Sequence, residues 1–128
     1  MQPRRLLAVT LWIVVAAILL QAWLAGSGLF GTPELFELHG WIGSGVLLLS
    51  ALAVVLSFVA REGALVTFGT VILAAGAMSQ IGMGYAGRRT GLTALSALHV
   101  PLGVALLGLA VALAVLTTIR RAPATEDR

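Results

Sequence analysis

Four long uncharged stretches take up nearly all of this 128-residue chain. The charged residues leave uncharged stretches at residues 6–33, 38–60, 63–87 and 90–119. Each is longer than the roughly 18 residues that indicate a membrane-spanning helix. Only 10% of the residues are charged, whereas a soluble domain has about a quarter. The sequence therefore predicts an all-α integral membrane protein with one domain, residues 1–128, and no separate water-soluble domain.

Glycine, proline and charged residues indicate where the helices end. We expect helices at about 6–26, 37–60, 64–86 and 93–119, which form a four-helix up-down bundle. The segments 26–28 and 31–33 are expected to end the first helix, 61–63 to form the second turn and 87–91 to end the third helix. Pro101 marks either the first turn of the fourth helix or a kink in a longer helix that begins near Thr93.

The arginines predict how the chain is oriented. With the N-terminus inside, six arginines lie on the inner side and only Arg88 and Arg89 on the outer side. Positive charge in short loops stays cytoplasmic, so both termini are expected in the cytoplasm, in a bacterial cytoplasmic membrane. The aromatic residues Trp23, Trp41 and Tyr85 then fall near the outer interface. Because the arginines flank hydrophobic runs and form no single basic face, the expected partner is the lipid bilayer and not nucleic acid.

A charged start before an apolar run is also typical of a secretory signal peptide. The run from Leu6 to Ala25 is longer than the apolar part of such a peptide. Trp23 also occupies a place where the cleavage site requires a small residue. We therefore expect this segment to be a retained first helix.

The first and second halves of the chain share an internal repeat. A glutamine, a Leu-His pair and a glycine recur 59 or 60 residues apart, at Gln21, His39 and Gly43 and again at Gln80, His99 and Gly103. This pattern indicates a duplicated helical hairpin. Both copies run in the same direction, so the second and fourth helices are parallel and lie diagonally across the bundle.

His39 and His99 are the candidate metal ligands. Ionisable residues inside membrane spans are rare and usually face the bundle interior. Both histidines lie within roughly the first two turns of their helices, so the two imidazoles are expected at one depth near the outer face. Converging from opposite sides of the bundle axis, they can supply both axial ligands of one haem b. The alternative is that each histidine forms a hydrogen bond between helices or is hydrated at the interface.

The neighbours of the histidines complete a candidate cofactor site. Gly43 and Gly103 lie one turn deeper on the same faces and either give clearance to a flat macrocycle or allow close helix packing. The two glutamines either bond to the second imidazole nitrogens or the edge of a cofactor, or link helices. Arg88 and Arg89 either pair with haem propionates or anchor the chain at the interface. The chain has no cysteine, which excludes Fe–S clusters and covalently attached c-type haem.

Three short motifs resemble one four-helix half of haem A synthase: Ser27-Gly28-Leu29, Gln80-Ile81-Gly82-Met83-Gly84 and Leu98-His99. The resemblance implies that His39 and His99, on the second and fourth helices, bind haem near the outer face. The chain also resembles small four-span bacterial membrane proteins of unassigned function that share a Leu-His-x-x-x-Gly signature. The synthase pattern has a glutamate three residues before the first histidine and an arginine after it, where this chain has Phe36 and Gly40. The resemblance therefore extends to haem binding and not to the oxidising chemistry.

These features predict a membrane b-type cytochrome that transfers electrons or handles haem, with no catalytic residues of its own. Two axial histidines leave no open position on the iron, and a substrate would first have to displace one of them. Two other functions fit the same residues. One is a non-catalytic accessory subunit of a membrane complex, and the other is a quinone-binding module in which His and Gln bind the two carbonyls. The candidate partners are a redox protein, a quinone and a second copy of the chain.

Overall fold

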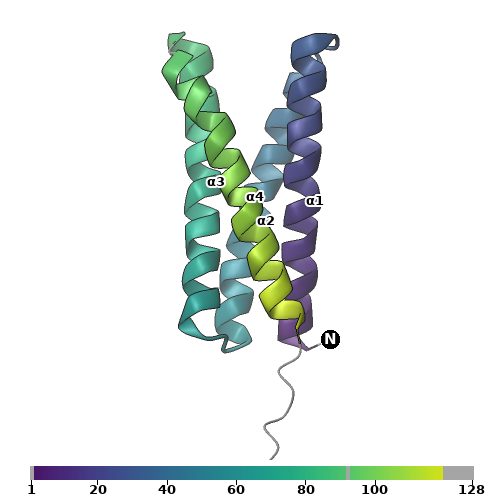
Figure 1. The fold of residues 1–128 in the computed structure, drawn as a ribbon, viewed down its shortest axis with the longest axis vertical. Helices are drawn as coiled ribbons and strands as arrows, with labels where there is room; N and C mark the ends of the chain where they lie inside the picture. The colour runs from purple at the N-terminus through teal and green to yellow at the C-terminus, as the bar shows by residue number, and fades with distance from the viewer. Residues whose placement is uncertain (1, 92, 120–128) are drawn as a thin grey trace, which may run out of the picture.

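The protein is a bundle of four long helices (Figure 1). The computed structural model describes residues 2–91 and 93–119, without the side chains of Arg88, Thr93 and Ser96. The helices are α1 (Pro3–Phe30), α2 (Leu35–Val59), α3 (Ala64–Thr90) and α4 (Thr93–Thr118). Each packs against two neighbours, so that α1 and α3 are diagonal, as are α2 and α4. All four are long and apolar enough to cross a membrane, which confirms the predicted all-α membrane bundle.

Helix α1 continues beyond its expected end. The predicted end near residue 26 was wrong, because α1 runs through 26–28 to Phe30, and it ends at the second predicted breaker segment, 31–33, with Gly31 as its C-cap. Gly28 is buried against the ring of Phe36 on α2, where an added Cβ would lie only 3.0 Å from the ring. Lipid offers no hydrogen bonds to a broken backbone, so a helix that is packed in this way tolerates glycine. Packing between α1 and α2 thus outweighs the weak helix preference of glycine.

The remaining helix ends follow from glycine and proline chemistry. Helix α3 continues through the segment 87–90 and ends at Gly91, whose φ of 67° is a left-handed conformation that glycine adopts without steric cost. Pro101 lies inside α4, which begins at Thr93, so the interpretation of a longer helix is correct. Proline has no N–H group, and the carbonyl of Ala97 therefore lacks its helical hydrogen bond. The tight turn between α2 and α3 lies where it was predicted.

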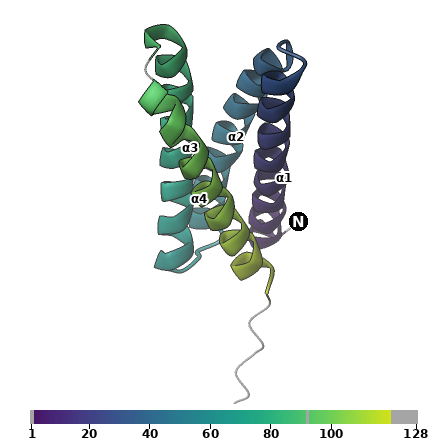
Figure 2. The ribbon, with the colours of Figure 1, turned by 45° about the horizontal axis from the view of Figure 1, so that its top comes forward.

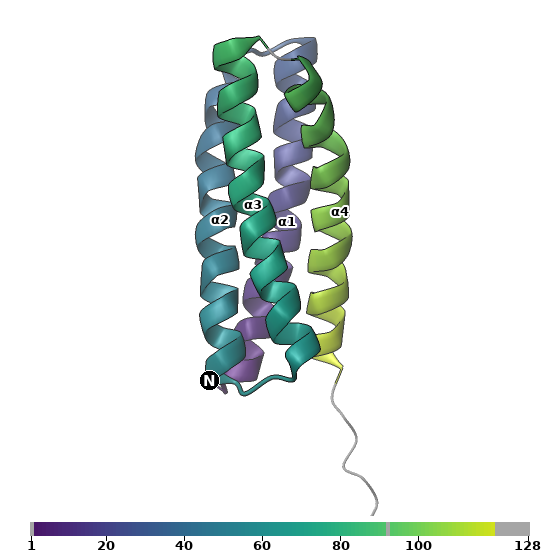
Figure 3. The same cartoon turned by 90° about the vertical axis from the view of Figure 1, so that its left-hand side faces the viewer.

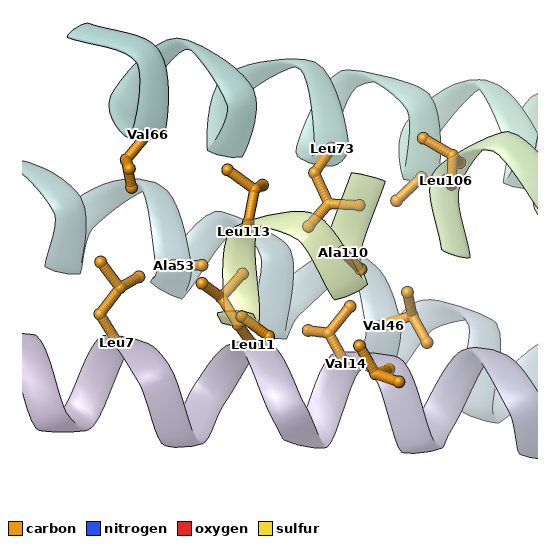
Figure 4. Close-up of a cluster of buried hydrophobic side chains, with 13 residues drawn as sticks. Leu7, Leu11, Val14, Val46, Ala53, Val66, Leu73, Leu106, Ala110 and Leu113 are labelled. Atoms are coloured by element: carbon orange, nitrogen blue, oxygen red, sulfur yellow. The ribbon is translucent and has the colours of Figure 1, made fainter. Parts of the chain in front are cut away.

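Aliphatic side chains from all four helices fill one half of the bundle (Figure 4). The labelled core includes Leu7, Leu11 and Val14 on α1, Val46 and Ala53 on α2, Val66 and Leu73 on α3, and Leu106, Ala110 and Leu113 on α4. Gly69 and Gly76 on α3 make room for Leu113 and Leu106 of α4. An added Cβ at Gly69 would lie only 2.7 Å from Leu113 Cδ2. These two glycines therefore serve close helix packing.

The two ends of the bundle differ. We call the end with the N-terminus, the 60–63 turn and the last turn of α4 the closed end (Figure 3). There Arg4 donates to the carbonyls of Thr117 and Leu116 at 3.2 and 3.3 Å and forms an ion pair with Glu62 at 3.4 Å. At the opposite end, which we call the open end, the hairpin α1–α2 diverges from the hairpin α3–α4, as Figure 2 shows. The core and the Arg4 contacts therefore hold the hairpins together at one end only.

Candidate functional site

A cavity of about 990 Å³ lies between the two hairpins at the open end. All four helices line it with mainly apolar side chains. Its polar lining includes both histidines and both glutamines of the repeat, with Glu34 and Glu37 from the start of α2. Cofactor and ligand pockets usually have volumes of roughly 300–1,000 Å³ and an apolar lining with few convergent polar groups. The cavity therefore has the size and lining of a cofactor site.

The imidazoles of His39 and His99 both line this cavity and lie close together. Their ring centroids are 6.1 Å apart and the ring planes are inclined by 50°. The helices that carry them, α2 and α4, are diagonal and do not pack against each other. The imidazoles thus approach from opposite sides, the convergence that the repeat predicted for His39 and His99.

The ring of His39 is held by the main chain of α1. Its Nδ1 lies 3.0 Å from the backbone oxygen of Gln21. A carbonyl oxygen only accepts hydrogen bonds, so this contact places the proton on Nδ1 and the lone pair on Nε2. Nδ1 of His99 is also buried near the backbone of Gln80 but forms no hydrogen bond of comparable geometry. The two copies of the repeat differ at this nitrogen.

The glutamine side chains repeat almost identically in the two hairpins. Nε2 of Gln21 donates to the backbone oxygen of His39 at 2.7 Å, and Nε2 of Gln80 donates to that of His99 at 2.8 Å. The duplicated hairpin predicted from sequence is thus visible in the hydrogen bonds. The expected contact between a glutamine side chain and an imidazole nitrogen is not formed, because each amide reaches the histidine main chain first. The alternative of a link between helices is the correct one.

Gly43 and Gly103 both line the cavity. An added Cβ would lie 3.5 Å from Gln21 Nε2 at Gly43 and 3.6 Å from Gln80 Nε2 at Gly103, which is ordinary van der Waals contact. Packing of the helices therefore does not require glycine at either position, in contrast to Gly69. This geometry favours clearance for a bound molecule over close helix packing.

Sequence reasoning missed Gly84 as a site residue. It lines the cavity, and an added Cβ would lie 3.8 Å from Cε1 of His99. Its spacing of four residues from Gln80 places both on one helix face, a signal that the sequence already contained. The rings of Trp41 and Tyr85, expected only as interface anchors, also line the cavity.

Of the two arginines proposed at the site, only the side chain of Arg89 is described. The side chain of Arg88 lies outside the described part of the structure. Arg89 is exposed and is not among the described side chains that line the cavity. Glu34 and Glu37, at the start of α2, do line it. Arg89 therefore does not line the cavity, and its pairing with a haem propionate stays a prediction.

A family model matches residues 21–87, just over half of the chain, and is described as a family of unknown function, DUF6220. The match includes the first Gln-His-Gly copy and Gln80, and it ends before His99. Neither the curated proteins nor the solved structures provided a match. The chain thus belongs to the DUF6220 family.

Proposed function

We propose that this protein binds one haem b between His39 and His99 and serves electron transfer or haem handling. The separation of the imidazoles carries the proposal. An imidazole nitrogen binds a metal ion at about 2.0–2.1 Å, and the ring centroid lies roughly 1.1 Å behind it, so two rings that bind one ion from opposite sides would have centroids about 6.2–6.4 Å apart. The observed separation is 6.1 Å. When bound, the haem supplies an iron that accepts and releases one electron.

The surroundings of the histidines support the same role. Metal-binding histidines usually donate their other ring nitrogen to a carbonyl or carboxylate, which fixes the ring and its tautomer. His39 makes this contact with the carbonyl of Gln21. Leu73, Ala77 and Leu106 line the inner part of the cavity and exclude water from the side of the core. Gly43 and Gly103 leave their faces clear for a flat molecule.

The proposed site lies near the outer face of a bacterial cytoplasmic membrane. This placement rests on the arginine distribution, which favours cytoplasmic termini. Exposed Trp41 and Tyr85 at the open end support it, because such rings gather at the membrane surface. An electron partner would then reach the cavity from the outer side or, as a quinone, from the lipid.

A reduced-minus-oxidised absorbance spectrum of the purified protein tests the proposal. We expect a sharp α-band from low-spin haem b. His39→Ala and His99→Ala should each abolish the low-spin spectrum. Ser79→Ala is the matched control, since Ser79 is exposed on α3 and bonds only to the carbonyl of Ala75 in its own helix.

A protein that stays colourless after expression with ample haem would contradict the proposal. The accessory subunit and the quinone-binding module would then be the remaining functions. An unchanged spectrum of His99→Ala would show that haem binds elsewhere or through other ligands.

A further inference from the structure

The two histidines are not held equally firmly. His39 is tied to Gln21 twice, through its ring at 3.0 Å and through its backbone oxygen at 2.7 Å. His99 is tied to Gln80 through its backbone oxygen, at 2.8 Å, and its buried Nδ1 makes only a weaker contact with the Gln80 backbone, outside hydrogen-bond geometry. The ring of His99 therefore rotates at a smaller cost than the ring of His39.

The helix that carries His99 is also less firmly held together than the helix that carries His39. The helix around His39 contains no proline, whereas Pro101 follows His99 by two residues inside α4. The carbonyl of Ala97 consequently lacks its helical partner, which loosens the turn that contains His99. This first part of α4 lies at the open end, away from the packed core.

The cavity has room beside His99. Its Cε1 faces Gly84, where even an added Cβ would remain 3.8 Å away. Gly103 lies one turn further along α4 and also lines the cavity. Glycine on both sides leaves space for the ring to move aside and for a small molecule to enter.

From these differences we infer that His39 is the fixed ligand and His99 the exchangeable one, so that the cavity binds a small neutral diatomic molecule in place of His99. This inference rests on the proposed haem site. The lining around His99 is largely apolar, with Val100 and Val104 beside it. Glu34 and Glu37 line the same cavity and disfavour anions such as cyanide or azide. Carbon monoxide, which is neutral and binds ferrous haem, is the suitable probe.

Carbon monoxide binding to the reduced wild-type protein is the first experiment. We expect the low-spin spectrum to convert to that of a carbonyl complex, with slow binding because His99 must leave first. His99→Ala should retain five-coordinate haem and bind carbon monoxide at least tenfold faster, and added imidazole should restore its low-spin spectrum. His39→Ala should lose most of its haem.

Pro101→Ala provides an independent test in which both ligands are kept. It restores the N–H group that the carbonyl of Ala97 lacks, so carbon monoxide binding should slow several-fold without a change in haem content. Val115→Ala is the control, because Val115 is exposed on the same helix and does not line the cavity, and it should not slow binding.

The outcomes separate the two proposals. A colourless wild-type protein overturns the proposed haem site and this inference with it. Low-spin haem that does not bind carbon monoxide overturns the inference alone. So does a protein in which His99→Ala loses haem while His39→Ala retains it, or in which Pro101→Ala leaves the binding rate unchanged.

Discussion

Gln21 and Gln80 show how a single side chain can organise a site in a nonpolar environment. Each donates to a histidine main-chain oxygen, which keeps a buried amide satisfied and fixes the helix that carries the ligand. Hydrogen bonds between membrane helices contribute modestly, about 0.6 kcal/mol on average. The hydrogen bonds of Gln21 and Gln80 therefore position the helices more than they stabilise the fold.

The contrast between Gly43 and Gly45 allows a test at the level of single residues. Both lie on α2, but Gly43 lines the cavity, whereas Gly45 has open space around it and does not. Gly43→Ala should leave the fold intact, because its Cβ would meet Gln21 at an ordinary contact distance, and should lower haem occupancy several-fold. Gly45→Ala should leave occupancy unchanged. The ratio of haem to protein, measured by absorbance after purification, decides whether Gly43 leaves room for haem or has only a structural role.

At the level of helices, close packing of α3 against α4 depends on glycine. Gly69→Ala should lower stability by about 1–3 kcal/mol, because the new methyl group would overlap a buried leucine. The leucine is Leu113, whose Cδ2 would lie 2.7 Å from the added Cβ. Thermal unfolding in detergent measures this loss.

The double variant Gly69→Ala with Leu113→Ala is the control for this contact. Removing the leucine side chain relieves the overlap, so the double variant should be less destabilised than the sum of the two single variants. Strict additivity would show that Gly69 acts through helix flexibility and not through contact with Leu113.

At the level of the whole molecule, the closed end holds the two hairpins together and the open end contains the cavity. Arg4 reaches from α1 to the last carbonyls of α4 and to Glu62, whose side chain is only 8% exposed. Together with the core it holds both hairpins at the closed end, while the hairpins diverge around the cavity. A bundle built in this way can keep a stable base and still open or close at the site.

The topology of the whole chain is open to a direct test. Four spanning helices place both termini on the same side, and the arginine distribution favours the cytoplasm. A reporter that is active only outside the cytoplasm should be silent when fused after Arg128 and active when inserted at Gly31. The opposite pattern would place the cavity at the inner face and would favour a cytoplasmic electron donor.

The sequence by itself determined the four helices and the positions of the repeated residues. Apolar stretches of this length have to be helical in lipid, because every backbone group needs an internal hydrogen bond. The spacing of Gln, His and Gly within each copy then places these residues at one end of the bundle, since helical geometry fixes their depth and face.

Only the tertiary structure decided which atoms meet. The partner of each glutamine, the end of α1 at Phe30 and the position of Arg89 outside the cavity all depend on how closely two helices approach. The repeat predicts equivalent histidines, yet only His39 has its ring bonded to the main chain of the neighbouring helix. The spacing of residues along one helix fixes the direction in which their side chains point. A hydrogen bond between two helices also requires a short distance between donor and acceptor. Side-chain packing and Pro101 set that distance.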